Sequence, residues 1–433
     1  MERLPGTDLD RARVLDLLSL LASGKGDEAA QLAQRGLALL DDTDEVSLLR
    51  ARLLDARGLA LVGQQAYDRA APDFQKALSL HDRSPQTASS LDVLRVPYHL
   101  GYMYAQWGRY ADAEREFRQL QGKLKQRSPV LELAVTTRLG QTLRWQGRYA
   151  EALPLLTAAL EQARDLYGPD SGMLILQHDA LADLLSEAGD YAPAEAHYAE
   201  RMRISAAIHG DDSVEYSMGL FNLATTRASR DQLDSAEALF RRALELRRQR
   251  LGPEAPTSLR AHNGLGLLLM RRGQVAEADP LLREADAGLA RRLPADAPAR
   301  VESRLAVVRL ELARGDLATA GAVLAELVPR IGPGVYMIER WELAGLLAAR
   351  SGDRAQAVKH LRRAVELAVV HYGRTTPESE RLRLLLVRAL LDAGQRDAAA
   401  RELAIAAPAL RAALPDNGPT LAELATLERA LAK

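Results

Sequence analysis

The stretch Trp107-Gly108-Arg109-Tyr110-Ala111-Asp112-Ala113-Glu114 decides the fold, because variants of it return along the whole chain. It reads W-Q-G-R-Y-A-E-A at 145–152, A-G-D-Y-A-P-A-E at 188–195 and R-G-Q-V-A-E-A-D at 272–279. In each variant an Ala stands five positions after a turn residue. This Ala occurs ten times, at 30, 70, 113, 152, 194, 236, 278, 320, 357 and 399. The nine intervals are 40, 43, 39, 42, 42, 42, 42, 37 and 42 residues, which indicates an internal repeat.

The residues around each repeat Ala also recur in phase. Twelve residues earlier stands a small residue, with Val308 and Val387 as exceptions: Gly58, Gly101, Gly140, Ala182, Ala224, Gly266 and Gly345. Four residues after the Ala comes a large apolar residue, such as Phe74, Phe117 or Phe240. Apolar residues at helical spacing on both sides of a turn predict an antiparallel helix pair. A single pair cannot bury both of its apolar faces, so the pairs must stack into an array.

The pattern resembles the tetratricopeptide repeat (TPR), which couples Leu-Gly in a first helix to a turn Gly, an Ala and an aromatic residue in a second. The 42-residue period and the segments Leu166-Tyr167-Gly168-Pro169, Ile208-His209-Gly210-Asp211, Leu251-Gly252-Pro253-Glu254 and His371-Tyr372-Gly373-Arg374 are similar to kinesin-light-chain-like repeats. The resemblance covers residues 8–411. It implies an all-α fold, a right-handed superhelical α-solenoid of about ten TPR helix hairpins.

The domain organisation follows from the same pattern. We expect a TPR solenoid over 1–414 and a C-terminal capping helix within 415–433, whose leucines at 421, 424, 427 and 431 share one face. The shortest interval, 37 residues, contains the connector 331–334, Ile-Gly-Pro-Gly. This junction predicts either a kink in the stacking or simple variation in loop length.

Composition narrows the class of protein. Lys and Arg total 57 and Asp and Glu 58, so no net charge points to nucleic acid or to a membrane surface. The chain has no Cys, and its first eight residues contain acids but no apolar signal segment. Only six of the basic residues are Lys, which we interpret as a GC-rich, bacterial genome. We therefore expect a cytoplasmic protein that binds no nucleic acid and no membrane.

No catalytic constellation is visible. The eight His residues never take metal-ligand spacing, and no nucleophile motif occurs. Asp179 and Asp183 share one helix face, which favours an acidic patch over a metal site. We predict no enzyme, no metal and no cofactor.

The resemblance implies that the first helix of each hairpin lines a concave groove that binds partner segments. Counting back from each repeat Ala gives an aromatic patch on repeats 3–4 and an Arg/Asn patch on repeats 7–8. The resemblance also implies that Asn222 and Asn263 bind the ligand main chain. The predicted groove residues are Tyr98, Tyr102, Gln141, Arg144, Trp145, Asn222, Arg260, Asn263, Arg271 and Arg309. Large aromatics with neighbouring Arg are common interface anchors, and Arg and Asn can bind a carboxylate or a peptide backbone. The alternative is that these side chains pair with one another, for example Arg144 with Asp179 and Asp183, and leave a solvated groove.

The function predicted from these observations is a protein-interaction scaffold or adaptor that binds a peptide or protein segment in the groove. The segment would have an apolar or aromatic part and an acidic part. The alternative is a ligand-responsive regulator, in which a peptide or small molecule changes the superhelix pitch and thereby a partner's activity. Self-assembly through the solenoid ends is a third possibility, and the sequence fixes no oligomeric state.

Overall fold

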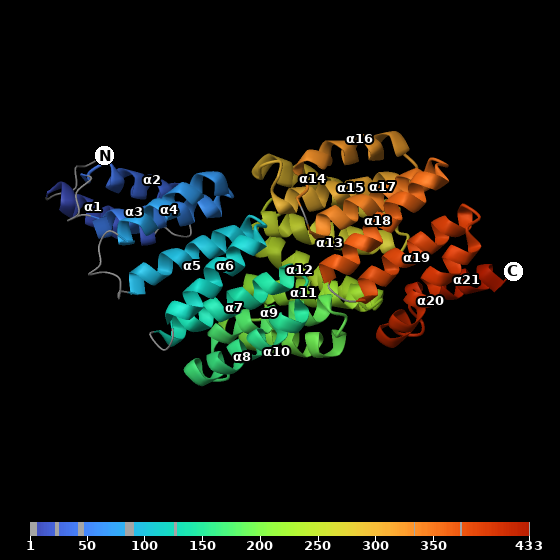
Figure 1. Ribbon diagram of the computed structural model, residues 1–433, viewed down its shortest axis with the longest axis horizontal. Coiled ribbons are helices and arrows are strands. Elements are labelled where there is room, and N and C mark those ends of the chain that lie inside the picture. Colours follow the sequence, from blue (N-terminus) through green and yellow to red (C-terminus); the bar gives the residue numbers. More distant parts are fainter. Residues whose placement is uncertain are drawn as a thin grey trace. The chain divides into compact units, whose positions relative to one another are not determined.

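The computed structural model describes residues 7–21, 26–41, 47–82, 91–124, 128–332, 334–372 and 375–432. Within these ranges the regular elements are 21 α-helices and two short 3₁₀-helices, without a strand (Figure 1). Three residues of the predicted loop motifs, Pro333, Gly373 and Arg374, lie outside the described ranges. The all-α prediction is confirmed.

The chain forms two compact units, residues 1–145 and 146–433, and each is described by itself. The first unit contains seven helices: α1 (Asp8–Leu21), α2 (Gly26–Leu37), α3 (Ser47–Gly63), α4 (Tyr67–Asp82), α5 (Leu91–Gln106), α6 (Tyr110–Leu124) and α7 (Pro129–Trp145).

The second unit contains the remaining α-helices. They are α8 (Tyr149–Tyr167), α9 (Ile175–Glu187), α10 (Tyr191–His209), α11 (Val214–Ser229), α12 (Leu233–Leu251), α13 (Pro256–Arg271), α14 (Val275–Arg292), α15 (Pro298–Arg314), α16 (Leu317–Leu327), α17 (Val335–Arg350), α18 (Arg354–Tyr372), α19 (Pro377–Asp392), α20 (Arg396–Ala413) and α21 (Pro419–Ala432). The 3₁₀-helices are Gly172–Leu174, before α9, and Val328–Arg330, after α16.

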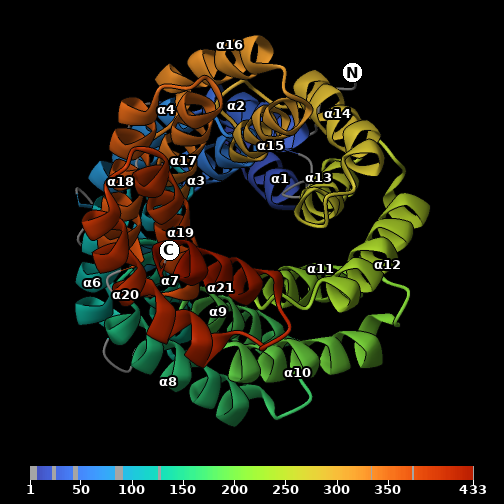
Figure 2. The same ribbon diagram turned by 90° about the vertical axis from the view of Figure 1, so that its right-hand side faces the viewer.

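The order of the helices gives ten consecutive pairs, α1–α2 to α19–α20, followed by α21. Nine of these pairs lie within one unit, which agrees with the prediction of about ten hairpins. In the second unit the first helices of the pairs form the inner side of an arc and the second helices the outer side (Figure 2). We call α9, α11, α13, α15, α17 and α19 the inner helices and α10, α12, α14, α16, α18 and α20 the outer helices.

In several hairpins a Gly of the first helix faces a large residue of the second helix. A Cβ added at Gly101 would lie 2.8 Å from the Phe117 ring, and one added at Gly266 would lie 2.6 Å from Leu282. Nine of the ten repeat Ala residues are buried, and Ala30 is half-buried. The two backbones can approach closely only because these positions carry almost no side chain.

The glycine-containing loops end one hairpin and start the next. Gly210 has φ 89°, in the left-handed region, and it stands directly after α10. Ser213 then accepts a hydrogen bond from the backbone N–H of Tyr216 at 3.1 Å and caps α11. This glycine-containing segment therefore ends one helix and caps the next.

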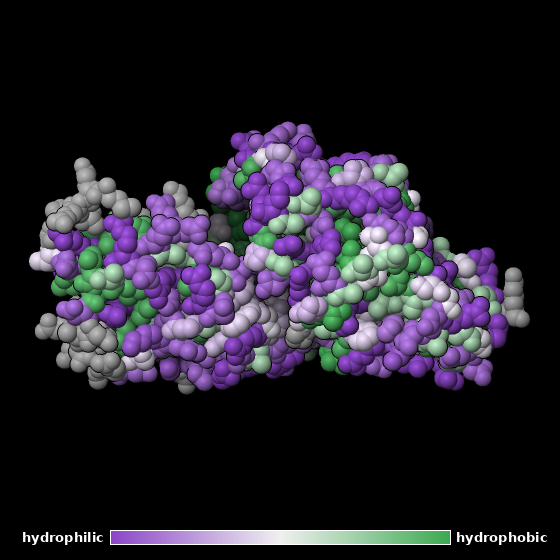
Figure 3. Space-filling view, turned by 90° about the horizontal axis from the view of Figure 1, so that it is seen from above, coloured by the Kyte–Doolittle hydropathy of each residue, from purple (hydrophilic) through white to green (hydrophobic). Residues whose placement is uncertain are grey.

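On the face shown in Figure 3, hydrophilic side chains predominate and hydrophobic ones gather in smaller patches. None of the described helices is both long enough and apolar enough to cross a bilayer.

Candidate functional site in the concave groove

The predicted aromatic patch lies in the first unit and is organised around an Arg that the sequence analysis did not single out. The Arg138 guanidinium lies 4.9 Å from the centre of the Tyr102 ring, and its Nε approaches the Tyr98 hydroxyl at 3.5 Å. Its Nη1 also donates to Gln141 Oε1 at 3.0 Å. Tyr98 and Tyr102 are half-buried and Gln141 is buried. One cation thus fixes three of the predicted residues from α5 and α7.

Trp145 has different neighbours. Its ring stacks on Tyr110 of α6 with centroids 5.6 Å apart, and the Arg144 guanidinium lies 5.6 Å from its centre. Arg144 is buried and Trp145 half-buried. Both Trp145 and Tyr98 thus contact a ring of α6, Trp145 through Tyr110 and Tyr98 through Phe117.

In the second unit, the inner helices leave a ladder of side chains exposed. Leu176 of α9, Met218 of α11 and Arg260 of α13 stand 42 residues apart and are all exposed, Leu176 by 39% and Met218 by 45%. All three belong to helices on the inner side of the arc (Figure 2). Asn222, also on α11, is half-buried. These residues form what we call the groove ladder: Leu176, Met218 and Arg260.

Three predicted groove residues have partners within the chain. Arg309 forms ion pairs with two carboxylates of α17, Glu342 at 2.7 Å and Glu339 at 3.0 Å. Arg271 pairs with Asp231 at 2.7 Å. Asn263 is 1% exposed and donates weakly to Glu302 Oε1 at 3.4 Å. Of the four predicted groove residues on α13 and α15, Arg260 alone has no hydrogen bond or ion pair in the described part of the chain.

The acidic residues of α9 also have described partners. Asp179 pairs with Arg201 of α10 at 3.0 Å, and Asp183 accepts a hydrogen bond from the Tyr198 hydroxyl at 2.6 Å. Burial raises the pKa of Asp179 to about 6, although the Arg201 charge opposes the shift. The interior between α9 and α10 is therefore poorly solvated.

Sequence reasoning missed Arg201 and Arg247, which reach from outer helices toward the inner side. The repeat carried a signal for both. Seven residues after the repeat Ala, the chain has Ala or Leu in eight of the nine repeats from the second onward, and Arg201 is the exception. Eleven residues after the Ala, the positions are apolar apart from His81, Ser205 and Arg247. An Arg at a core position of the repeat indicates a buried, specifically partnered charge.

The end of the second unit packs against the turns between earlier inner and outer helices, and we call this contact the seam. A Cβ added at Gly189, in the α9–α10 turn, would lie 2.5 Å from Pro377 of α19. One turn further on, Arg381 of α19 donates to the backbone carbonyl of Ser229. Tyr191, the first residue of α10, belongs to the same hydrophobic cluster as α18–α21. Helix α21 packs against the inner helix α19 and the outer helix α20 (Figure 2).

Asp231 is the centre of the seam. Its carboxylate is fully buried and pairs with Arg271 and Arg381, at 2.7 and 3.3 Å. It also accepts the backbone N–H of Thr420 at 3.0 Å, at the start of α21. Asp231 has φ 62°, whereas most of the corresponding turns have Gly at this left-handed position. A strained residue is retained here because it joins α13, α19 and α21.

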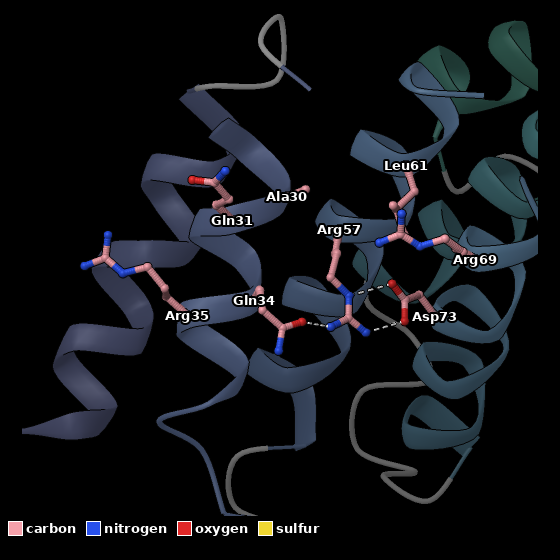
Figure 4. A pocket seen from close by; sticks show the side chains of 8 residues that line it. All are labelled: Ala30, Gln31, Gln34, Arg35, Arg57, Leu61, Arg69 and Asp73. Atoms are coloured by element: carbon pink, nitrogen blue, oxygen red, sulfur yellow. Dashed lines mark hydrogen bonds and ion pairs between the residues drawn. The ribbon is translucent and has the colours of Figure 1, made fainter. Parts of the chain in front are cut away.

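A cavity of about 580 Å³ lies in the first unit between α2, α3 and α4 (Figure 4). Arg57 crosses it and donates to both oxygens of Asp73, the Nε–Oδ2 distance being 2.7 Å, and to Gln34. Asp73 is buried, so this paired charge holds α3 against α4. These contacts give Arg57 and Asp73 a structural role.

Among the described residues, no group of three or more His, Asp or Glu side chains could hold a metal ion. The buried His178 and the half-buried His197 form a pair, with 3.0 Å between their Nδ1 atoms. Burial, followed by the neighbouring His197, lowers the pKa of His178 to about 4. The pair is therefore neutral near pH 7.

Comparison with known proteins adds the family and the fold. The MalT-like TPR region family matches residues 57–371. No functionally curated protein matches the sequence.

Several solved structures share the architecture. A Rap protein in complex with Competence and Sporulation Factor is 14% identical, with a TM-score of 0.57 over 83% of this chain and 98% of that chain. A TPR protein from Parabacteroides merdae is 18% identical, with a TM-score of 0.43 over 68% and 98% of the two chains. Nearly identical TPR-like repeats of a putative kinesin light chain from Podosopora anserina are 21% identical, with a TM-score of 0.38 over 47% and 96%.

Proposed function

The chain belongs to the MalT-like TPR region family, and we propose that it is a scaffold that binds a peptide or protein segment along its inner helices. The observation that carries this proposal is the groove ladder. Leu176, Met218 and Arg260 are left exposed on three successive inner helices. An apolar side chain that the fold leaves in water at a repeated, concave position is available to a ligand.

The spacing of the ladder suits an extended or helical segment. One exposed side chain per repeat offers successive contacts along the groove, and Asn222 adds a side-chain amide that can bind a peptide main chain. The Rap protein of the same fold was crystallised with Competence and Sporulation Factor, which supports a ligand of this kind. The aromatic residues Tyr98, Tyr102 and Trp145 of the first unit are proposed as a second contact region.

The proposal is tested by selecting binders from a random dodecapeptide library on the immobilised full chain. Affinities of the selected peptides are then measured by calorimetry for Met218→Glu and Asn222→Ala, and for the outer-face control Arg242→Ala. We expect each groove substitution to weaken binding by about tenfold or more and the control to leave it unchanged. Selected peptides that bind all three variants equally well would show that the groove is not the site.

The first unit is tested separately with the same peptides. Replacing Tyr102 by Ala removes the ring that Arg138 covers, whereas replacing Tyr110 by Ala removes the ring behind Trp145. We expect the first substitution to weaken binding if this region contacts the ligand. Unchanged affinity in both variants would confine the site to the second unit.

A second candidate function, the ligand-responsive regulator, is favoured by the seam. Helices α11 and α13 line the groove and also carry Ser229, at the end of α11, and Arg271, whose contacts hold α19 and α21. A ligand that shifts these inner helices would change the seam. The test is the distance between spin labels placed on α12 and α21, for which the absence of native Cys is convenient. A distance unchanged by a bound peptide would exclude this function.

A further inference from the structure

Arg247 is a buried cation without a carboxylate partner in the described part of the chain. It is 5% exposed and extends from the outer helix α12 between the starts of α11 and α13. Its guanidinium donates to the Ser217 hydroxyl at 3.2 Å, to the Thr257 carbonyl at 3.0 Å and to the Ser217 carbonyl at 3.4 Å. It also lies 4.7 Å from the centre of the Phe221 ring. All these partners are neutral.

The preceding repeat contains the carboxylate partner that Arg247 lacks. Arg201 of α10 is equally buried, 2% exposed, and reaches the same side of its hairpin, but it pairs with Asp179 of α9. The residue 42 positions after Asp179 is Phe221. Two neighbouring repeats thus bury an Arg of the outer helix, at positions one helical turn apart, and a carboxylate pairs with it in one of them only. A buried charge without a counter-charge is costly, and an added carboxylate relieves that cost.

Arg260 is an exposed cation near this buried charge. It is the exposed groove-ladder residue of α13, and it stands one helical turn after Thr257, whose carbonyl accepts a hydrogen bond from Arg247. After burial, the charge of Arg260 also contributes to a lowered pKa of Arg247. Met218, the ladder residue of α11, is next to Ser217, which binds Arg247. The apolar surface of Met218 and Phe221 and the two cations therefore meet at one place on the inner side.

We propose that Arg247 and Arg260 form a binding site for one carboxylate group of the segment held in the groove. This inference rests on the proposed function and names the chemistry of its ligand. The ligand carboxylate supplies the negative charge that Asp179 supplies to Arg201 one repeat earlier. The exposed Arg260 binds it directly, and the buried Arg247 supplies a second positive charge in a poorly solvated surrounding, where charge interactions are strong.

The surroundings limit the ligand to a single carboxylate at this point. On one side lie Asp179 and Asp183 of α9, with Arg201 as their cation. On the other side lie Glu302, Glu339 and Glu342, with Arg309 as theirs. Both flanks carry an excess of negative charge among these residues. A run of acidic residues would be repelled there, so the ligand carries one acid flanked by neutral or basic residues.

The experiment uses the peptides selected on the full chain. Each is compared with its Glu→Gln or Asp→Asn version, and with a version carrying two further Glu residues beside the first. For the wild-type chain we expect removal of the acid to weaken binding by about tenfold. The additional acids should weaken binding too. The preference for the acid should fall to less than about twofold in Arg260→Gln and remain in the outer-face control Arg242→Gln.

A second variant restores the arrangement of the preceding repeat. Phe221→Asp places a carboxylate beside Arg247, so it should abolish the preference for an acidic peptide without a change at either Arg. Selected peptides that tolerate Glu→Gln, or that bind better with three acids than with one, would overturn this inference and leave groove binding in place. If no selected peptide responds to Met218→Glu or Asn222→Ala, groove binding itself fails, and the carboxylate site with it.

Discussion

At the scale of single residues, the repeat depends on positions that carry no side chain. Gly101 of α5 faces Phe117 of α6 so closely that even a Cβ needs the ring to move. Gly122, also on α6, is exposed with no atom within 4 Å of an added Cβ. The two glycines lie in the same hairpin and differ only in what surrounds them.

We therefore expect Gly101→Ala to lower the free energy of unfolding by about 1–3 kcal/mol, because the Phe117 ring is forced out of its packed position. Gly122→Ala should raise it by about 0.5–1 kcal/mol, because Ala is the better helix former. Urea denaturation of both variants measures the difference. Equal effects of the two substitutions would show that the small residue has no packing role.

His178 gives a residue-scale prediction about acid. Its folded-state pKa, about 4, is below the ordinary value of 6.5, so between these pH values the unfolded chain binds a proton that the folded chain excludes. The stability contributed by neutral His178 is present above pH 6.5 and falls as the pH decreases toward 4, by about 1.4 kcal/mol per pH unit.

The free energy of unfolding of His178→Gln should therefore decrease less than that of wild type between pH 6.5 and 4, by about 1.4 kcal/mol per pH unit. Burial raises the pKa of Asp179, which acts in the opposite direction, but Asp179 is present in both chains. His209, which is exposed, provides the control His209→Gln, with an expected slope equal to wild type. The measurement is urea denaturation at several pH values, and parallel curves for wild type and His178→Gln would contradict the account.

At the scale of helices, the seam depends on one turn. Asp231 and Gln65 are the described non-glycine residues with φ in the left-handed region, at 62° and 60°. Asp231 is buried and binds Arg271, Arg381 and the backbone of Thr420, whereas Gln65 has no described side-chain partner. Side-chain contacts thus compensate for the backbone strain at Asp231, whereas none is described at Gln65.

Replacing each of them by Gly separates strain from contact. Asp231→Gly should lower the free energy of unfolding by about 2–4 kcal/mol, since the loss of a buried ion pair outweighs the relief of strain. Gln65→Gly should leave it unchanged or raise it by up to about 1 kcal/mol. Hydrogen exchange in α21 should accelerate in the first variant only. Unchanged exchange there would show that Asp231 does not hold the C-terminal helix.

The helices themselves were predictable from sequence because each hairpin is specified locally. The repeat Ala, the small residue twelve positions before it and the large residue four positions after it fixed ten hairpins. The seam was not predictable, because it joins residues such as Asp231 and Thr420, 189 positions apart, and no repeat encodes the curvature that brings them together.

The candidate site was predictable in part for the same reason. Counting within the repeat identified inner positions such as Arg260 and Arg271, and the resemblance added Asn222. It could not tell that Arg309 is bound by Glu339 and Glu342, since those carboxylates belong to the next repeat. Arg247 was passed over because it is on an outer helix, and only the path of its side chain brings it to Phe221.

At the scale of the whole molecule, the claim is that the inner helices hold a ligand segment and the outer helices do not. A photo-reactive benzophenone side chain placed at Met218 on α11, and separately at Arg242 on α12, tests it with a peptide selected for binding to the full chain. We predict a covalent adduct from position 218 after illumination and none from 242, as measured by mass spectrometry. An adduct from 242 with none from 218 would contradict the account.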